Sequence, residues 1–325
     1  PPSLPLTLFP PVPKKLLKQV GEAIRDWDMI KEGDRLCLGL SGGKDSLTLL
    51  HVLLHLQKKA PIRFSVACAT VDPQTSSFDP SPLIPYMKAL GVPYHYLSHP
   101  IIAQAKAQLQ GDSLCSFCSR MKRGLLYTCC VESGYNKLLL AQHLDDLVES
   151  LFMSLMHNGQ TRTMKANYQG ERGIRVIRPL IYTREAVTHA FATGNRLPII
   201  NENCPACFEQ PKERARIKKM LRKEESLLPR MYANIRRGIL PLLDEDTYGV
   251  FQSKYAAIEE RIRHRKANKG KVATKGREEG MEEVTEEGGQ ERGEDGREEE
   301  EEEIGRLRGR GCQDGVCLGM MVDEE

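Results

Sequence analysis

The sequence LCLGLSGGKDSLTLL, which spans residues 36–50, is the stretch from which the fold of this chain follows. Its apolar start, residues 36–40, predicts a buried parallel strand, and the leucine spacing after Ser46 predicts a helix. A glycine turn at 41–43 separates the two elements. A strand, a glycine turn and a helix start present backbone N–H groups and the positive end of the helix dipole to an anion. The stretch therefore predicts a phosphate-binding loop within an α/β fold.

The residues of this loop suit phosphate oxygens, because glycines let the backbone approach, hydroxyls donate hydrogen bonds and a lysine adds a point charge. The candidate nucleotide-binding residues are Ser41, Gly42, Gly43, Lys44, Asp45 and Ser46. A Walker A loop would require Gly in place of Leu38 and Ser or Thr in place of Asp45. The pattern S-G-G-x-D-S resembles instead the PP-loop of the ATP pyrophosphatase superfamily, whose members cut ATP between its α- and β-phosphates. An incidental glycine turn before a helix is the alternative interpretation.

The charge of the chain is unevenly distributed. Residues 278–325 hold 19 acidic and 5 basic residues, whereas residues 1–277 hold 25 acidic and 42 basic residues. A body this basic predicts a polyanionic partner such as RNA, although a basic surface that only keeps the protein soluble is the alternative. The polar loop 157–173, with Arg162, Lys165 and Arg172, is either an RNA contact or a solvated loop.

Composition divides the chain into four expected parts. They are a proline-rich segment without regular structure at 1–12, the α/β domain at 13–240, a basic extension at 241–277 and a disordered acidic tail at 278–325. No run of 18 apolar residues occurs, so no membrane span is expected. No secretory signal opens the sequence, so we expect a cytoplasmic protein. An organellar location is left open, because the sequence begins at Pro1 rather than Met.

Further apolar runs alternate with helical patterns along the α/β domain. Strands are expected at 64–71, 92–97, 137–142 and 175–179, and helices at 82–90, 184–193 and in two basic segments after residue 211. This alternation predicts a Rossmann-like, doubly wound and mainly parallel sheet. Ligands of such sheets bind at the carboxyl ends of the strands, so Asp72 is a candidate for the nucleotide or metal edge. A turn-forming Asp-Pro pair is the alternative.

The segment HLDDLVE at 143–149 follows a predicted strand and starts a helix. Its carboxylates lie three or four residues apart and can face the head of that helix, where carboxylates suit Mg²⁺. His143 and Asp146 are therefore candidates for contact with the nucleotide or its magnesium ion. The alternative is an N-terminal cap whose acidic residues complement the helix dipole. The PP-loop superfamily repeats a G-H-x-x-D-D-x-x-E motif here, from which this chain departs at Gln142.

Two C-x-x-C pairs occur at metal-ligand spacing, Cys115 with Cys118 and Cys204 with Cys207. The residues alone leave three chemistries open: a structural zinc site, a disulfide or persulfide relay, and an iron–sulfur cluster with three cysteine ligands. Four other cysteines lie within predicted strands or a helix and are expected to be buried thiols. These are Cys37, Cys68, Cys129 and Cys130.

Several motifs, in this order along the chain, resemble the tRNA 2-thiocytidine synthetase (TtcA) family. They are SGGKDS at 41–46, CSFCSRMKRGLLY at 115–127, H-x-D-D-x-x-E at 143–149, VIRPLIYTREAV at 176–187 and CPAC at 204–207. The resemblance covers residues 13–240. It implies an enzyme that uses ATP and Mg²⁺ to adenylate the C2 oxygen of cytidine 32 in tRNA and then replaces that oxygen with sulfur.

The resemblance also implies roles for the site residues. Lys44, beside Asp45, stabilises charge at the α-phosphate, and three cysteines hold a [4Fe–4S] cluster. The ligands carried over are Cys115, Cys118 and one of the second pair, with Cys207 favoured over Cys204. The expected partners are tRNA and a sulfur donor such as a cysteine desulfurase system, and a homodimer is left open.

Three alternatives to this function are weighed. A 2-thiouridine synthetase of the same superfamily usually carries paired cysteines at both chain ends, whereas here no cysteine precedes Cys37, and Cys312 and Cys317 form one loose pair. A tRNA lysidine synthetase needs no thiol cluster. A non-catalytic RNA- or nucleotide-binding scaffold would usually lose part of the phosphate loop or the acidic helix head, and both are intact here.

Overall fold

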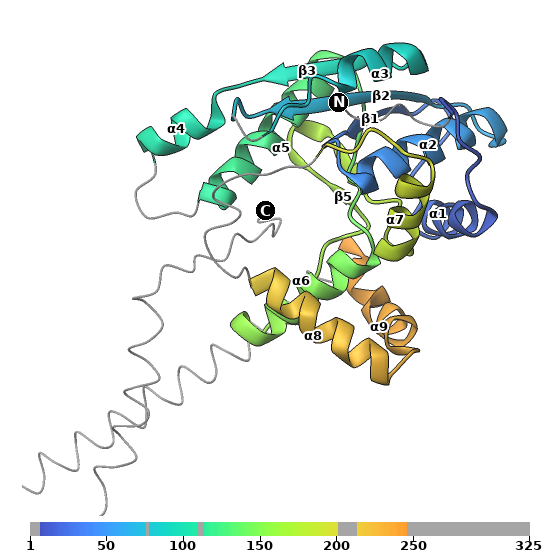
Figure 1. Ribbon diagram of the computed structural model, residues 1–325, viewed down its shortest axis with the longest axis vertical. Coiled ribbons are helices and arrows are strands. Elements are labelled where there is room, and N and C mark those ends of the chain that lie inside the picture. Colours follow the sequence, from blue (N-terminus) through green and yellow to red (C-terminus); the bar gives the residue numbers. More distant parts are fainter. Residues whose placement is uncertain (1–6, 76–77, 109–113, 201–212, 246–325) are drawn as a thin grey trace, which may run out of the picture. The chain divides into compact units, whose positions relative to one another are not determined.

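The strands form a single mixed sheet in the computed structural model, which describes residues 7–75, 78–108, 114–200 and 213–245. Its strand order is β3-β2-β1-β4-β6-β5, and Figure 1 labels β1, β2, β3 and β5 of this sheet. The strands are β1 Arg35–Gly39, β2 Ser65–Asp72, β3 Tyr94–Ser98, β4 Lys137–Leu139, β5 Asn167–Gln169 and β6 Arg175–Ile177. The expectations for Cys204 and Cys207, and for residues 246–325, lie outside the described residues.

Parallel pairing dominates this sheet. β1 lies between β2 and β4 and is parallel to both, with Leu36 opposite Val66 on one side and Lys137 on the other. β2 with β3 and β4 with β6 are also parallel, and β5 alone is antiparallel to its neighbour. The predicted doubly wound, mainly parallel sheet is therefore confirmed.

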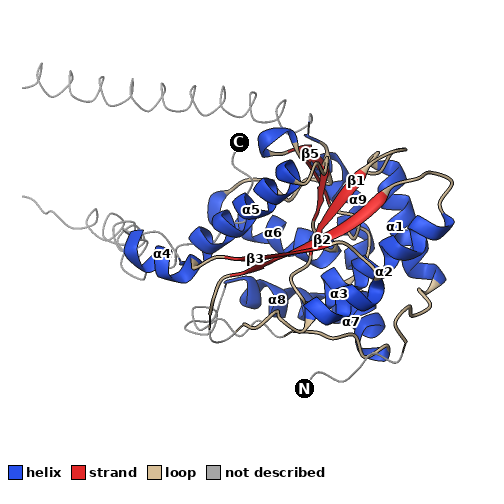
Figure 2. Ribbon diagram, turned by 90° about the horizontal axis from the view of Figure 1, so that it is seen from above, coloured by secondary structure: helices blue, strands red, loops and turns tan. Residues whose placement is uncertain are grey.

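Helices cover both faces of the sheet. Figure 2 shows α5 on one side of the strands and α2, α3 and α7 on the other. The helices are α1 Lys14–Asp26, α2 Lys44–Lys59, α3 Leu83–Leu90, α4 Ile101–Gln108, α5 Leu114–Glu132, α6 Leu144–Asn158, α7 Glu185–Gly194, α8 Glu213–Leu227 and α9 Met231–Ile239. Short 3₁₀ turns occur at Glu171–Gly173 and Leu240–Leu243. None of these helices is both long and apolar enough to cross a bilayer.

The alternation of side chains along each strand builds two separate apolar layers. Leu36 and Leu38 of β1 join the larger layer beneath α1, α2, α3 and α7, whereas Cys37 between them joins the smaller layer beneath α5. Leu139 and Leu138 of β4 divide in the same way. Continuous apolar runs are required in β1, β2 and β4 because these central strands are buried on both faces.

The four cysteines expected to be buried thiols are all buried. Cys37 of β1 lies against Cys129 and Cys130 of α5, and hydrogen bonds among the three thiols together with burial raise the pKa of Cys37. Burial alone raises the pKa of Cys68. All four side chains pack the core, and the raised pKa values of Cys37 and Cys68 make those two thiols poor nucleophiles.

The sequence interpretation missed two elements. The segment 157–173 is expected to be loop throughout, yet β5 forms within it as a three-residue edge strand, and α4 is not predicted. A short antiparallel strand has too few residues to show alternation, so its polar composition resembles a loop. Within that segment, Lys165 donates to the carbonyl of Asp244 and Arg172 donates to Thr128. These two side chains serve internal contacts.

The position of β1 in the sheet defines where a ligand binds. The chain moves from β1 to β2 on one side and later returns to β4 on the other side, so the strand order reverses between β1 and β4. In open α/β sheets, ligands bind in the crevice outside the carboxyl ends of the strands at such a switch point. The loop after β1 is 40–43, and the loop after β4 is 140–143. The two predicted motifs therefore meet at this edge.

Candidate active site

The phosphate loop has the backbone geometry that its sequence predicts. Gly42 adopts a φ of +79°, a conformation that L side chains rarely adopt, and a Cβ there would lie 3.1 Å from Cβ of Ile200. The backbone N–H of Ile200 donates to the carbonyl of Gly42 at 2.9 Å and holds the turn. Gly43 is the N-cap of α2, and it has no side chain to cap the helix. The first-turn N–H groups of α2 are thus presented to an anion.

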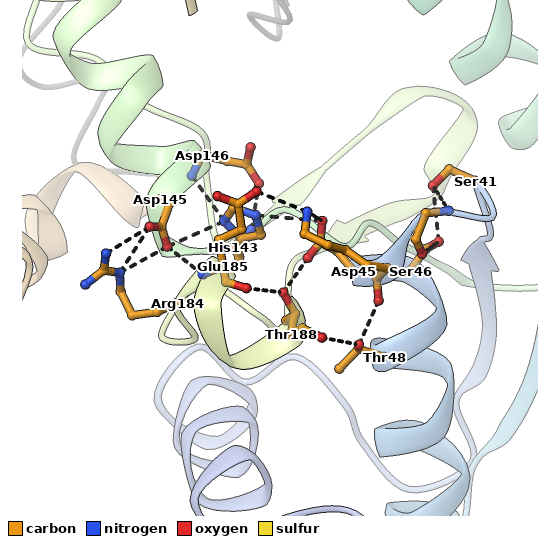
Figure 3. A network of polar contacts seen from close by, with 12 residues as sticks. Ser41, Asp45, Ser46, Thr48, His143, Asp145, Asp146, Arg184, Glu185 and Thr188 are labelled. Atoms are coloured by element: carbon orange, nitrogen blue, oxygen red, sulfur yellow. Dashed lines mark hydrogen bonds and ion pairs between the residues drawn. The ribbon is translucent and has the colours of Figure 1, made fainter. Parts of the chain in front are cut away.

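Hydroxyls tie the loop to its helix. The Ser41 and Ser46 oxygens lie 3.1 Å apart, and the Ser46 hydroxyl donates to the carbonyl of Gly43 at 3.0 Å (Figure 3). Ser46 is buried at the start of α2, so this bond fixes the turn on its buried side. The loop is preorganised before any ligand arrives.

The head of α6 is closed by a capping box. His143 is the N-cap residue, its Nδ1 accepts from the backbone N–H of Asp146 at 3.3 Å, and the Asp146 carboxylate accepts from the backbone N–H of His143 at 3.0 Å. Because Nδ1 accepts this bond, the neutral ring carries its proton on Nε2. That nitrogen lies 3.8 Å from Oδ2 of Asp45 in the phosphate loop. The capping interpretation is therefore realised, and it aims the imidazole at the loop.

Lys44 lies between two carboxylates. Its Nζ is 3.0 Å from Oδ2 of Asp45 and 3.1 Å from Oε1 of Glu185, the first residue of α7. Burial acts to lower the pKa of Lys44, but the two carboxylates outweigh it and raise the pKa above its ordinary value. The lysine is therefore cationic in the ligand-free site.

Glu185 is shared between two lysines. Its second oxygen lies 2.6 Å from Nζ of Lys218 on α8. Burial acts to raise the pKa of Glu185, yet the hydrogen bonds from Lys218 and Lys44 outweigh it and lower the pKa to about 2. The carboxylate thus links the phosphate loop to α8.

Asp145 and Asp146 have different contacts although they are adjacent in the sequence. Asp145 is 9% exposed and accepts a forked pair of bonds from Arg184, together with the backbone N–H of Glu185 at 2.7 Å. Asp146 is 21% exposed and faces Arg214 at 3.3 Å (Figure 3 shows the two aspartates at the head of α6). Asp145 therefore positions α7 against α6, and Asp146 is the carboxylate open to a ligand.

Glu149 completes the acidic helix head. It lies one turn after Asp145, is buried, and its Oε2 is 4.0 Å from Nε of Arg214. Burial, followed by repulsion from Asp146, raises the pKa of Glu149 to about 7. Glu149 therefore keeps its proton to a higher pH than an exposed glutamate does.

The structure brings four of the sequence-predicted residues together: Lys44, Asp45, His143 and Asp146. Asp72 is placed differently, since its carboxylate accepts from the backbone N–H of Gln74 at 2.8 Å and from the Tyr96 hydroxyl at 2.7 Å. The turn-forming interpretation of Asp72 is the one that its contacts match.

The first cysteine pair lies on a helix. Cys115 and Cys118 occupy the first turn of α5, three residues apart, and Cys118 is half-buried. The second pair, Cys204 and Cys207, lies outside the described residues. Whether the two pairs meet therefore stays a prediction.

Sequence reasoning missed the contribution of α7 and α8. Glu185 and Thr188 of α7 contact Lys44 and Asp45, and Arg214 and Lys218 of α8 reach the same network. The signal for Glu185 was available, because it starts the helix that comes after β6 and so lies at the carboxyl edge. No comparable signal marks Lys218 among the many cations of α8.

The chain has relatives among known proteins. The PP-loop domain family matches residues 13–225. The tRNA-cytidine(32) 2-sulfurtransferase of Pseudomonas fluorescens is 39% identical over 229 residues, covering 70% of this chain and 83% of the relative. The enzyme of the same name from Alkalilimnicola ehrlichii is 41% identical over 225 residues, covering 68% of this chain and 71% of the relative.

A solved structure shares the fold. The U34-tRNA thiolase NcsA from Methanococcus maripaludis, solved with its [4Fe-4S] cluster, superposes with a TM-score of 0.59 at 20% identity. The match covers 71% of this chain and 78% of that chain. At this identity the likeness supports the α/β architecture described above.

Proposed function

Because this chain belongs to the PP-loop family and, within it, to the tRNA-cytidine(32) 2-sulfurtransferases, we propose that it thiolates C2 of a cytidine in tRNA at the expense of ATP. Position 32 is the position that the relatives' names print. The observation that carries the proposal is the meeting of Lys44 and Asp45 with His143 at the switch point between β1 and β4. The cytidine assignment is favoured over a 2-thiouridine synthetase by the named relatives, and an intact site disfavours a scaffold.

The proposed reaction is redox-neutral in two displacements. The C2 oxygen of the cytidine attacks the α-phosphorus of ATP, the bond to the bridging oxygen breaks, and pyrophosphate leaves. Sulfur at the oxidation level of sulfide then attacks C2, and the bond from C2 to the activated oxygen breaks as AMP leaves. ATP is needed because a carbonyl oxygen is a poor leaving group, whereas AMP is a good one.

The chain's own residues have distinct roles in the first displacement. The N–H groups at the start of α2 and the Ser41 hydroxyl hold phosphate oxygens, while the Ser46 hydroxyl keeps its bond to the carbonyl of Gly43. Lys44 supplies the charge that stabilises the α-phosphate as it is attacked. His143, with its proton on Nε2, donates toward a phosphate oxygen at the same edge.

The open carboxylates of the site fit a magnesium ion. Mg²⁺ prefers oxygen ligands and is usually held by one or two carboxylates together with substrate phosphates. Asp45 and Asp146 both contact His143 and supply such a pair, whereas Asp145 is already engaged by Arg184. When bound, the ion neutralises the departing pyrophosphate.

The thiols of α5 fit an iron–sulfur cluster in donor chemistry, because clusters are held by cysteine thiolates. Cys115 and Cys118 lie on the first turn of α5, and we propose Cys207, with Cys204 as the alternative, as the third ligand. A cluster with three protein ligands leaves one iron for sulfur. We further propose that a cysteine desulfurase system in the cytoplasm supplies this sulfur as a persulfide, from which two equivalents of an external thiol release sulfide as they are oxidised to a disulfide, and we leave a homodimer open.

Release of AMP that depends on tRNA tests this proposal. The wild-type chain, given ATP, Mg²⁺, sulfide and unmodified tRNA, is expected to release AMP and pyrophosphate, and Lys44→Met is expected to slow this by about 10²–10³-fold. Lys59→Met, at the far end of α2, is the matched control and keeps the wild-type rate. A wild-type chain that binds ATP and tRNA but releases no AMP would establish the scaffold alternative.

A further inference from the structure

Helix α8 has two faces of different chemistry. Its inner face buries Ile217 and Leu221 in the core. Beside these, Arg214 contacts Asp146, Lys218 contacts Glu185, and Glu225 contacts Arg184 at 2.6 Å. The inner face is therefore fastened to the adenylation site.

The outer face of α8 is basic and exposed. Positions 215, 216, 219, 222, 223 and 226 recur at helical spacing on one side, and all six are exposed. Four of these residues are cations and none is acidic: Arg216, Lys219, Arg222 and Lys223 accompany Ala215 and Ser226. All three glutamates of the helix lie off this face, which concentrates positive charge on one side.

Three of these cations have no counter-charge within the described part of the chain. Arg216 is paired with Glu213, but the side chains of Lys219, Arg222 and Lys223 form no ion pair or hydrogen bond with a described residue. Like charges three and four residues apart on a helix repel one another and weaken the helix. A polyanion docked on the face removes this penalty and gains the charge attraction.

We infer that Lys219, Arg222 and Lys223 form a surface that contacts the phosphate backbone of the tRNA. The inference rests on the proposed function, which makes tRNA the polyanion that must approach the site. The same helix touches Glu185 and Asp146 through its inner face, and a helix with side chains is about 10 Å across. A strand held on the outer face therefore lies one helix diameter from the adenylation site, close enough for an unstacked base to enter.

The salt dependence of tRNA binding tests this surface directly. We compare the full wild-type chain with the variant Lys219→Ser/Arg222→Ser/Lys223→Ser, using unmodified tRNA over a range of salt concentrations. Each lost phosphate contact lowers the slope of log affinity against log salt by roughly one unit, so the slope is expected to fall by about two to three. Affinity at low salt is expected to fall by about tenfold or more.

A second triple variant controls for net charge. Lys15, Lys59 and Arg63 are exposed cations, and the latter two lie at or just beyond the end of α2 that is about 24 Å from the phosphate loop. Lys15→Ser/Lys59→Ser/Arg63→Ser removes the same charge and is expected to change the slope by less than about one unit. Equal losses of tRNA affinity and salt slope in both variants would show that net charge alone causes the effect. That result would overturn the proposal that α8 contacts tRNA.

Failure of the surface and failure of the proposed function are separable. ATP affinity without tRNA reports the adenylation site and is expected to be the same in the α8 variant and the wild type. Unchanged tRNA affinity and slope in the α8 variant, with a wild type that thiolates tRNA, would overturn the surface alone. A steep loss of binding in that variant, with a wild type that thiolates nothing, would support the surface and overturn the function.

Discussion

In the ligand-free site, Lys44 is paired with the carboxylates of Asp45 and Glu185. Of these two pairs, we expect the one with Glu185 to break when ATP binds. Asp45 is fixed beside Lys44 by the loop, but Glu185 also binds Lys218 at 2.6 Å. When phosphates attract Lys44, Glu185 keeps a cationic partner and need not be buried alone. We therefore expect Lys218 to lower the free-energy cost of moving Lys44 from Glu185 to a phosphate.

Removing Lys218 is expected to weaken ATP binding although its side chain contacts no predicted phosphate site. In Lys218→Met, Lys44 is the remaining lysine partner of Glu185 among the described residues. The Lys44–Glu185 ion pair is then stronger, and ATP must break it to bind Lys44. We expect the Kd for ATP without tRNA to rise by about three- to tenfold. Lys219→Met, its neighbour on the outer face of α8, is the control for charge loss, and an equal Kd in both variants would contradict this role.

Glu149 predicts a pH dependence of stability. Its folded pKa of about 7 lies above its ordinary value of 4.5, so the folded state binds more protons than the unfolded state between these values. Stability is therefore fullest below about pH 4.5, falls as pH rises toward 7, and stays lower above it.

Glu149→Gln removes this titration because the amide stays neutral. We expect urea unfolding without added metal to show on the order of 2–3 kcal/mol more stability than wild type at pH 8, and little difference at pH 5. Glu224→Gln, on the neighbouring helix α8, is expected to keep the wild-type dependence of stability on pH. A wild-type chain equally stable at both pH values would contradict the assignment.

At the scale of elements, β4 is fastened to the turn before β1 by a buried ion pair. Lys137 lies 2.7 Å from Oδ2 of Asp34 and donates to the carbonyl of Met29, and both charged side chains are buried. Asn136 donates to the same carboxylate. This contact fixes β4 beside β1, and so aligns the two loops of the site.

Breaking this pair is expected to leave a charge buried alone. Lys137→Met should lower the free energy of unfolding by about 3–5 kcal/mol, because Asp34 then loses its cationic partner. The double variant Asp34→Asn/Lys137→Met should recover part of this loss. The loss is measured by urea unfolding, and a loss below about 1 kcal/mol in the single variant would show that water reaches Asp34.

The elements show how far sequence reasoning reached. The unit β1–loop–α2 was predicted because its apolar run, glycines and leucine spacing are local signals that agree with one another. The helix head at 143–146 was predicted for the same reason. β5 was not predicted because three residues are too few to show the alternation of apolar and polar side chains. Only its pairing with β6 defines it as a strand.

The site was predicted only where its residues are close in sequence. Lys44 with Asp45, and His143 with Asp146, stand in motifs, and the structure adds that the two motifs face each other. The Glu185–Lys218 pair joins residues 33 positions apart on two helices, and only tertiary packing brings them together. A contact of this kind leaves no pattern in a single sequence.

At the scale of the whole molecule, the packed unit extends to the end of the described chain. Tyr232, Ile239 and Leu243 are buried in the main core, and the backbone N–H of Ala166 donates to the carbonyl of Leu243. The Arg184 guanidinium lies 3.4 Å from the ring centroid of Tyr232, and that of Arg236 lies 3.9 Å from that of Tyr182. Helices α8 and α9 are thus part of the catalytic domain.

Two truncations test where the folded domain ends. A chain that ends at residue 245 keeps every buried residue named above, and we expect its Tm to stay within about 2 °C of the full chain. A chain that ends at residue 212 loses the buried side chains of α8 and α9, and we expect no cooperative unfolding. If the chain that ends at residue 245 fails to unfold cooperatively, residues essential to the core lie after residue 245.

Nucleoside analysis of tRNA identifies the product of the proposed reaction. Unmodified tRNA is incubated anaerobically with the chain, ATP, Mg²⁺ and sulfide, digested to nucleosides, and analysed by mass spectrometry. We expect 2-thiocytidine in the presence of ATP, and its loss in Lys44→Met and Cys118→Ala. Formation of 2-thiouridine instead, or of no thiolated nucleoside by a chain that still releases AMP, would contradict the proposed reaction.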